Sequence, residues 1–262
     1  MATLYSRGFA VESLTFSLND RVAMPAPVPV ASIRDFYAFE QHVKTCRSHR
    51  GLAMLPQWYE VPVFYFSNPT AVIGDGDPVW APQGSMALDY ELELACVIGS
   101  KARDLPPDDL AMSCVAGFTI MNDWSARDLQ RVEMAVGLGP SKSKDFATSL
   151  GPRVVPFGEL KNAYRDGRLH LEMVARVNGK EYSRGNSGSM HWTWPQLLAH
   201  ASRDAELQPG DVLGSGTVGT GCILELTPEA VDGWLKPGDV VELEIEGIGR
   251  LRNPVVQHPA SR

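Results

Sequence analysis

The stretch LDYELELACVIG, residues 88–99, carries the pattern of a β-strand. Leucines and a tyrosine alternate with acids, which is the period-two signature of a strand with one buried face. The polar face holds Asp89, Glu91 and Glu93, with no cation between them. Like charges two residues apart on a strand repel each other, and strands disfavour Asp and Glu. Two interpretations stay open from this stretch alone: solvent screens the three acids, or the acids bind a divalent cation.

The 262-residue chain has the composition of a globular protein, with 44% hydrophobic residues and a formal net charge of -7. No cluster of Lys and Arg stands out, so we expect no nucleic-acid partner. No apolar run is long enough to cross a bilayer, and the first residues lack a signal-peptide core. We therefore expect no membrane association and a cytoplasmic location. The four cysteines are widely spaced and form no CxxC pair. We therefore expect buried free thiols, in a protein from a reducing compartment, at Cys46, Cys96, Cys114 and Cys222.

Most of the chain has the pattern of short strands. Residues 1–32, which include MPAPVPVAS, are interpreted as an extended arm before a domain that spans residues 33–262. Helices are predicted over residues 32–51, over a segment that opens at Asp123, and over TWPQLLAHASRDA. Strands are predicted in RVVPFGEL, LHLEMVARVNGKEY, CILELTPEA and VVELEIEGIGRLRNP. The pattern predicts one α+β domain, mainly β, around a largely antiparallel, curled sheet.

Two other motifs do not identify a site by themselves. GSGTVG, residues 214–219, matches a dinucleotide fingerprint, which requires a strand that leads into the N-terminus of a helix. Here the strand-like TGCILEL follows, so we reject a dinucleotide site. A Gly-rich loop near a bound substrate stays open. Glu242, Glu244 and Glu246 repeat the alternating acids without a second catalytic motif nearby, and we interpret them as a solvated strand face. Alternating acids therefore do not identify a cation site by themselves.

Two of the predicted helices carry side chains that could join the acids. Asp123, Arg127 and Gln130 are spaced i, i+4 and i+7, which places them on one helix face. Asp35 and His42 share the same spacing on the other helix. Each set also has an ordinary structural explanation. Asp123 could cap its helix and pair with Arg127, and His42 could be a partly buried structural histidine. Together with the acidic strand, they would supply a group of carboxylates beside a histidine, an arginine and a glutamine.

The chain resembles the fumarylacetoacetate hydrolase family from about Ile33 onward. The segments that carry the resemblance occur in the family's order: RDFYAFEQH, PVFYF, LDYELELACVIG, MNDWSARDLQ, KDFATSLGPRVVP and SGTVGTGCILEL. The resemblance implies a mixed β-roll with a few flanking helices, in the form without the additional N-terminal domain of the animal enzymes. It also implies a homodimer and a divalent cation, Mg²⁺ first and Ca²⁺ or Mn²⁺ as alternatives. The implied ligands of that cation are Asp35, Glu91, Glu93 and Asp123.

The resemblance also implies roles for other residues. His42 would be the general base that activates water, oriented by Glu225. Lys144 rather than Lys142 would lie in the site, because its spacing to FATSLGP fits the family. The remaining roles are stabilisation of negative charge by Arg127, Gln130 and Lys144, and contact with the substrate by Tyr37, Tyr65 and Thr217.

The implied reaction is hydrolysis of a carbon–carbon bond in a 1,3-diketo acid such as fumarylacetoacetate or an acylpyruvate. The same scaffold hosts decarboxylases, hydratases and isomerases of small 2-keto acids, which form the alternative. A scaffold that binds a metal or a protein partner without catalysis is a further class. The presence of a base, its orienting acid and three charge-stabilising groups argues against that class.

Overall fold

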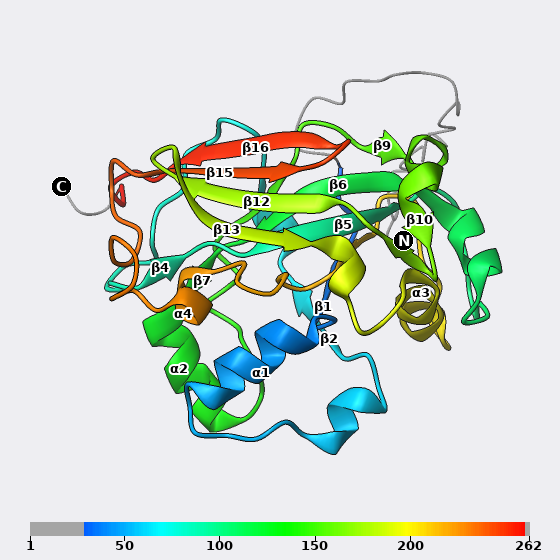
Figure 1. Ribbon diagram of the computed structural model, residues 1–262, viewed down its shortest axis with the longest axis horizontal. Coiled ribbons are helices and arrows are strands. Elements are labelled where there is room, and N and C mark those ends of the chain that lie inside the picture. Colours follow the sequence, from blue (N-terminus) through cyan, green and yellow to red (C-terminus); the bar gives the residue numbers. More distant parts are fainter. Residues whose placement is uncertain (1–28, 260–262) are drawn as a thin grey trace, which may run out of the picture.

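The computed structural model describes residues 29–259. Its larger sheet has eight strands, in the order β2-β1-β14-β5-β6-β8-β3, and β9 also pairs with β6 (Figure 1). Two pairs, β1 with β14 and β3 with β8, are parallel and the others are antiparallel, so the sheet is mixed. The strands are β1 Ile33–Phe36, β2 Phe64–Ser67, β3 Val72–Ile73, β5 Leu92–Ile98, β6 Val115–Asp123, β8 Thr148–Leu150, β9 Val155–Pro156 and β14 Val212–Gly214.

A second sheet of four antiparallel strands, in the order β13-β12-β15-β16, packs against the larger one. In Figure 1 its strands β15 and β16 lie above β6, and β12 and β13 lie at the level of β5 and β6. Side chains from both sheets, such as Leu94 of β5 and Leu243 of β15, share one hydrophobic core. These four strands confirm the prediction of strands in LHLEMVARVNGKEY and VVELEIEGIGRLRNP. Their bounds are β12 Glu172–Val177, β13 Lys180–Asn186, β15 Val240–Ile245 and β16 Gly249–Pro254, with short pairs formed by β4 Leu88–Asp89 with β7 Ser125–Ala126 and by β10 Tyr164–Arg165 with β11 Arg168–Leu169.

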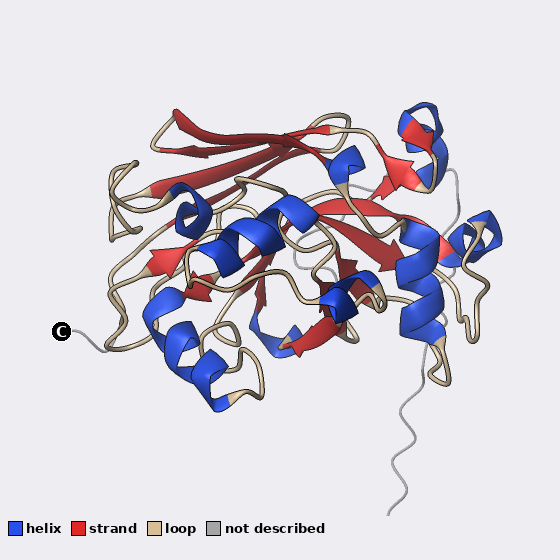
Figure 2. Cartoon of the chain, turned by 60° about the horizontal axis from the view of Figure 1, so that its bottom comes forward, coloured by secondary structure: helices blue, strands red, loops and turns tan. Residues whose placement is uncertain are grey.

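The helices lie outside the two sheets, and α1 and α2 are on the side away from the four-stranded sheet (Figures 1 and 2). The predicted helix in TWPQLLAHASRDA is confirmed as α3. It begins with a capping box, in which Thr193 Oγ1 accepts from the backbone N–H of Gln196 at 3.3 Å. The α-helices are α1 Glu40–Ser48, α2 Arg127–Val136, α3 Trp194–Ser202 and α4 Ile223–Leu226; the 3₁₀ helices are Pro56–Tyr59, Pro69–Ala71, Asp109–Cys114, Phe157–Ala163 and Ser187–Ser189.

The helix predicted over residues 32–51 is wrong at its start. Asp35 lies in strand β1, and only the shorter α1 is helical. β1 pairs on one side with β2 and on the other with β14, so ladder hydrogen bonds on both edges outweigh the local helical pattern. Ser32 does not cap a helix, because its hydroxyl donates to Asp211 Oδ1 at 2.7 Å.

Two further predictions of local structure are wrong. Asp123 is the last residue of β6 rather than a helix cap, and α2 begins four residues later, at Arg127. The segment CILELTPEA contains the single turn α4 instead of a strand. The Asp89 carboxylate accepts the backbone N–H groups of Ile223 and Leu224 at 2.8 and 3.0 Å. A distant side chain therefore satisfies the first amides of this turn.

The stretch at residues 88–99 is divided into β4 and β5 by a break at Tyr90 and Glu91. β5 lies between β14 and β6, and all residues from 88 to 98 are buried. Leu94 packs into the main core, while Ala95 joins a smaller cluster on the opposite face of the strand. Glu93 is 0% exposed. Screening of the acids by solvent is therefore excluded.

Other expectations concern the ends of the chain and its cysteines. Most of the predicted arm, residues 1–32, lies outside the described residues. Between residues 29 and 259, no helix is long and apolar enough to cross a bilayer. The prediction of buried free thiols is confirmed for Cys46, Cys96, Cys114 and Cys222.

Candidate functional site

Four buried carboxylates from separate segments meet inside the larger sheet. Each offers one oxygen, and these oxygens lie within 4.8 Å of one another. The segments are β1, the break before β5, β5 itself and the end of β6. Gly214 of β14 pairs with the residue in β1, and a Cβ atom there would lie 2.4 Å from Asp35 Oδ1. The glycine therefore leaves room for this carboxylate. The carboxylate cluster consists of Asp35, Glu91, Glu93 and Asp123.

Arg127 is fixed beside the carboxylate cluster by three side chains. Its Nε donates to Asp89 Oδ2 and its Nη2 to Glu91 Oε1, both at 2.8 Å. Its Nη1 donates to Gln130 Oε1 at 2.9 Å. The predicted proximity of Arg127 and Gln130 is confirmed, although Asp123 lies on a strand and not on their helix. Asp89 holds the arginine and α4 in place and is not a member of the cluster.

Lys144, and not Lys142, lies in the site. Its Nζ donates to Glu91 Oε2 at 2.5 Å and also donates to Asp123 Oδ2. The side chain of Lys144 is 6% exposed, whereas that of Lys142 is 78% exposed and pairs with Asp145. The choice between the two lysines made from the sequence is therefore supported by burial and by contact with the carboxylates.

The carboxylate cluster carries more negative charge than its cationic contacts balance. Burial raises the pKa of Asp35, Glu93 and Asp123. Burial would also raise the pKa of Glu91, but the charges of Lys144 and Arg127 outweigh it and hold that pKa below its usual range. Two buried oxygens, Glu93 Oε2 and Asp123 Oδ1, have no hydrogen-bond partner among the described residues. A divalent cation fits this site, because it would neutralise the excess charge and bind the unpartnered oxygens.

His42 and Glu225 form a buried pair next to the carboxylate cluster. His42 Nδ1 lies 2.6 Å from Glu225 Oε1, and Glu225 Oε2 accepts the backbone N–H of Thr220 at 3.0 Å. Burial alone would lower the pKa of His42, but hydrogen bonds to Cys222 and Glu225 and the charge of Glu225 raise it well above its usual value. A charge on His42 lowers the pKa of Glu91, so the imidazole is electrostatically coupled to the cluster.

The three residues expected to contact the substrate surround these groups. Tyr65 donates its hydroxyl proton to Asp123 Oδ2, and Thr217 Oγ1 donates to Glu93 Oε1 at 3.3 Å. The ring of Tyr37 lies edge-on to that of His42, with centroids 5.4 Å apart. A cavity of about 250 Å³ adjoins the site, and its lining residues are Tyr65, Phe66, Ser67, Asn68, Pro140, Ser141, Lys144 and Asp145.

A wider hollow of about 620 Å³ lies elsewhere, between Pro107 and Leu110 on one side and Thr193 on the other. It shares no residue with the carboxylate cluster or with the pair of His42 and Glu225. The smaller cavity is therefore the better candidate for substrate entry, since Lys144 and Tyr65 connect it to the cluster.

One feature of the site was missed in the sequence. Cys46 and Cys222 lie beside His42, although both were interpreted only as buried thiols. The spacing of His42 and Cys46, one helical turn apart, is a signal that could have revealed the first contact. No local pattern predicts the second, because 176 residues separate Cys46 from Cys222 and only the tertiary fold joins them.

Comparisons with known proteins agree with the fold. The family model for the fumarylacetoacetate (FAA) hydrolase C-terminal domain matches residues 31–256. A fumarylacetoacetase of Arabidopsis thaliana is 31% identical over 264 residues, which cover 81% of this chain and 62% of the plant protein. An oxaloacetate tautomerase of Xenopus laevis is 33% identical over 195 residues, 74% of this chain and 58% of the relative. The chain thus spans about three fifths of these two relatives.

A solved structure supports the same assignment of the fold. The X-ray structure of 5-carboxymethyl-2-hydroxymuconate delta-isomerase from Mycobacterium smegmatis aligns with a TM-score of 0.69 and 29% sequence identity. The alignment covers 90% of this chain and 82% of the isomerase. The mixed β-roll expected from the sequence is therefore confirmed. These named relatives are enzymes, but a hydrolase, a tautomerase and an isomerase are all among them.

Proposed function

The chain belongs to the fumarylacetoacetate hydrolase family, and we propose that it is a divalent-cation-dependent hydrolase of 1,3-diketo acids such as fumarylacetoacetate or an acylpyruvate. One observation carries the proposal: the structure holds a buried pair of His42 and Glu225, 2.6 Å apart, together with four clustered buried carboxylates. A histidine oriented by a carboxylate can accept a proton from water when its imidazole is neutral. The fumarylacetoacetase relative supports the same reaction class.

The carboxylate cluster would hold the cation. Its ligands are all oxygens, which favours Mg²⁺ first, with Mn²⁺ and Ca²⁺ as alternatives. When bound, such a cation supplies Lewis-acid polarisation of a substrate carbonyl. Lys144 and Arg127 remain beside Glu91 and keep it ionised, so at least one ligand is ready at neutral pH.

His42 would act on the water molecule. Donation of the Nδ1 proton to Glu225 leaves Nε2 as the acceptor, and Glu225 then stabilises the imidazolium that forms. The water oxygen bonds to one substrate carbonyl, and the bond from that carbon to the central carbon breaks. The electron pair stays on the central carbon as an enolate, which then takes a proton. Both products end in a carbonyl or carboxylate group.

The other residues would stabilise charge and position the substrate. Arg127 and Lys144 are already held by carboxylates, so little reorganisation is needed when negative charge develops on the substrate oxygens. Gln130 contacts Arg127 and adds an amide donor at the same place. The proposed substrate contacts are Tyr37, Tyr65 and Thr217.

A second candidate function comes from the isomerase and tautomerase relatives. The protein would then isomerise or tautomerise a small 2-keto acid, and decarboxylation or hydration would belong to the same group. The test is incubation with fumarylacetoacetate, two acylpyruvates and oxaloacetate in the presence of Mg²⁺, with products separated by chromatography. Two acids from one diketo acid support the hydrolase. A single isomeric product, or loss of CO₂ alone, supports the second candidate and contradicts the first.

We extend the proposal to a homodimer. Apolar side chains near the end of α2 support it, since Val132, Val136 and Leu138 are 65%, 80% and 92% exposed. Exposed apolar side chains that lie close together are typical of protein–protein contacts. Sedimentation equilibrium measures the mass in solution, and a monomer at all concentrations would contradict this part of the proposal.

A further inference from the structure

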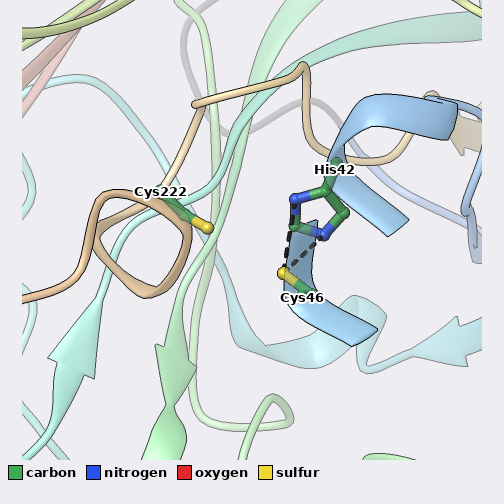
Figure 3. A group of neighbouring side chains, drawn as sticks. All are labelled: His42, Cys46 and Cys222. Carbon is green, nitrogen blue, oxygen red and sulfur yellow. Dashed lines mark hydrogen bonds between the residues drawn. The ribbon is translucent and has the colours of Figure 1, made fainter. Parts of the chain in front are cut away.

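A second group of potential metal ligands lies beside the proposed general base. Donor atoms of His42, Cys46 and Cys222 lie within 4.8 Å of one another, and all three residues are buried (Figure 3). Cys46 follows His42 by one turn of α1, and Cys222 is the residue before α4. The hydrolytic mechanism uses neither thiol. We call these three residues the thiol–imidazole cluster.

The contacts in the thiol–imidazole cluster surround His42. Cys46 Sγ lies 3.8 Å from Nδ1 and 3.9 Å from Nε2 of the imidazole, as the dashed lines in Figure 3 mark. Cys222 Sγ lies 3.9 Å from Glu225 Oε1, and this oxygen is the partner of His42 Nδ1 at 2.6 Å. Two sulfurs, one ring nitrogen and one carboxylate oxygen thus come together from α1 and the α4 segment.

These donors match the preferences of a thiophilic cation. A tetrahedral Zn²⁺ site with Zn–S bonds of about 2.3 Å and Zn–N bonds of about 2.0 Å has neighbouring donors roughly 3.3–3.8 Å apart. Side-chain shifts on the order of 1 Å would bring the present donors to that spacing. Thiolates and imidazole favour Zn²⁺ and Co²⁺ over Mg²⁺, which prefers oxygens. The two neighbouring clusters therefore differ in the cations that they select.

We propose that His42, Cys46 and Cys222 form a second, inhibitory site for thiophilic divalent cations of the Zn²⁺ class, with Glu225 as the fourth ligand. Binding replaces the two S–H protons, which are released to solvent. The cation would bind His42 at Nδ1, and the proton that Nδ1 otherwise donates to Glu225 would move to Nε2. The nitrogen that would accept a proton from water is then a donor. This inhibitory consequence rests on the proposed function, whereas the binding site does not.

The site itself is tested without an activity measurement. The full-length protein is saturated with Mg²⁺, kept reduced with a phosphine, and titrated with Co²⁺. We expect a thiolate-to-cobalt charge-transfer band in the near ultraviolet that saturates at one Co²⁺ per chain. Cys46→Ser and Cys222→Ser should each weaken or abolish the band. Cys114→Ser is the matched control, because its sulfur donates to Ala111 O, a contact that a hydroxyl can replace, and it should keep the band.

Folding of each variant is checked by circular dichroism and thermal unfolding before titration. Two independent thiol variants are used so that one unstable variant does not decide the result. Absence of the band in the wild-type protein would overturn the site. A full-strength band in both folded thiol variants would overturn it as well, since the cobalt would then be bound elsewhere.

Inhibition is tested by adding Zn²⁺ to the Mg²⁺-saturated protein. We expect loss of turnover that a chelator reverses once Mg²⁺ is restored. In Cys46→Ser and Cys222→Ser, the Zn²⁺ concentration for half inhibition, measured against each variant's own rate, should rise by roughly 10–100-fold or more. Equal inhibition of the wild type and both variants would mean that Zn²⁺ acts at the carboxylate cluster, which overturns the inhibitory role. A protein without hydrolase activity would still give the cobalt band, so failure of the proposed function is distinguishable from failure of the site.

Discussion

Arg127 and Glu91 form an ion pair of 2.8 Å whose side chains are only 5% and 6% exposed. Asp89 accepts from Nε of the same guanidinium group at 2.8 Å, so two carboxylates hold the arginine. A buried charge is stable only when its hydrogen-bonding groups are satisfied, and here Gln130 accepts from the third nitrogen. These contacts fix the position and orientation of the guanidinium group relative to the carboxylate cluster.

The first prediction changes this arginine. Arg127→Lys keeps the charge but loses the planar group that contacts Asp89 and Glu91 together. Loss of one hydrogen bond to a charged group costs about 1.5–3 kcal/mol, so kcat/KM should fall roughly 10–100-fold. Binding of Mg²⁺, measured by calorimetry, should persist. Arg131→Lys on the exposed part of the same helix is the control, and a wild-type rate in Arg127→Lys would remove this residue from the site.

The second prediction compares the two neighbouring lysines. Lys144→Ala leaves Glu91 and Asp123 without their shared ammonium group, and breaking such a buried pair costs about 3–5 kcal/mol. Lys142→Ala removes only an exposed pair, which contributes about 1 kcal/mol or less. Urea denaturation in the presence of a chelator measures both free energies of unfolding. Similar losses for the two variants would contradict the different environments of these lysines.

The third prediction concerns removal of the cation. A chelator should abolish turnover, and Mg²⁺ or Mn²⁺ should restore it, because the carboxylate cluster offers oxygens alone. The cation should also raise the free energy of unfolding, by about 2.7 kcal/mol at a free concentration one hundred times its Kd. Thermal unfolding with and without Mg²⁺ measures this change. Full turnover by protein shown to be metal-free would contradict the assignment.

The fourth prediction separates two glutamates with the same alternating sequence context. Glu93→Ala should lose the stabilisation by Mg²⁺ and the activity together, because its Oε2 is buried and has no hydrogen-bond partner within residues 29–259. Glu244→Ala should keep both, since its carboxylate is partly exposed and pairs with Arg176 and Arg250. The loss of these surface pairs costs about 1 kcal/mol or less. Equal effects on cation binding would show that the two acidic strands had been distinguished wrongly.

Part of the fold followed from the sequence because the relevant interactions are local. The strands β15 and β16 alternate and are joined by a short turn, and Thr193 with Gln196 forms the capping box that starts α3. Asp35 was placed in a helix because its neighbours DFYAFEQH have helical spacing. Its actual strand depends on Gly214, 179 residues away, and no local pattern contains that pairing.

The four carboxylates implied by the resemblance lie together, but through a geometry that differs from the one expected from the sequence. Asp123 and Arg127 were grouped as one helix face, but Asp123 ends β6 and reaches the cluster through the sheet. Glu225 was expected on a strand, whereas it lies on the turn α4 that the Asp89 carboxylate caps. The family resemblance implied a set of carboxylates that the structure brings together, while burial, charge balance and the neighbouring thiols required the three-dimensional structure.

The last prediction concerns the acid limb of the pH–rate profile, which reports the proposed base. Hydrogen bonds and the charge of Glu225 outweigh burial and raise the pKa of His42 above its usual value of about 6.5. A base must be neutral in the free enzyme, so kcat/KM should fall as the pH drops through this raised pKa. In Glu225→Gln the negative charge that raises the pKa of His42 is lost, whereas the burial that lowers this pKa remains. The acid limb of the pH–rate profile should therefore move to lower pH.

The same measurement on His42→Ala completes the test. General-base catalysis is typically worth about 10²–10⁴ in rate, so this variant should lose that factor and also lose the acid limb, while it still binds Mg²⁺. Glu225→Gln should lose less, because it keeps the shape of the side chain but not the charge that stabilises imidazolium. The profiles are recorded with Mg²⁺-saturated protein on a cleavable diketo acid. Cleavage by His42→Ala at the wild-type rate, or an unchanged limb in Glu225→Gln, would contradict proton transfer through this pair.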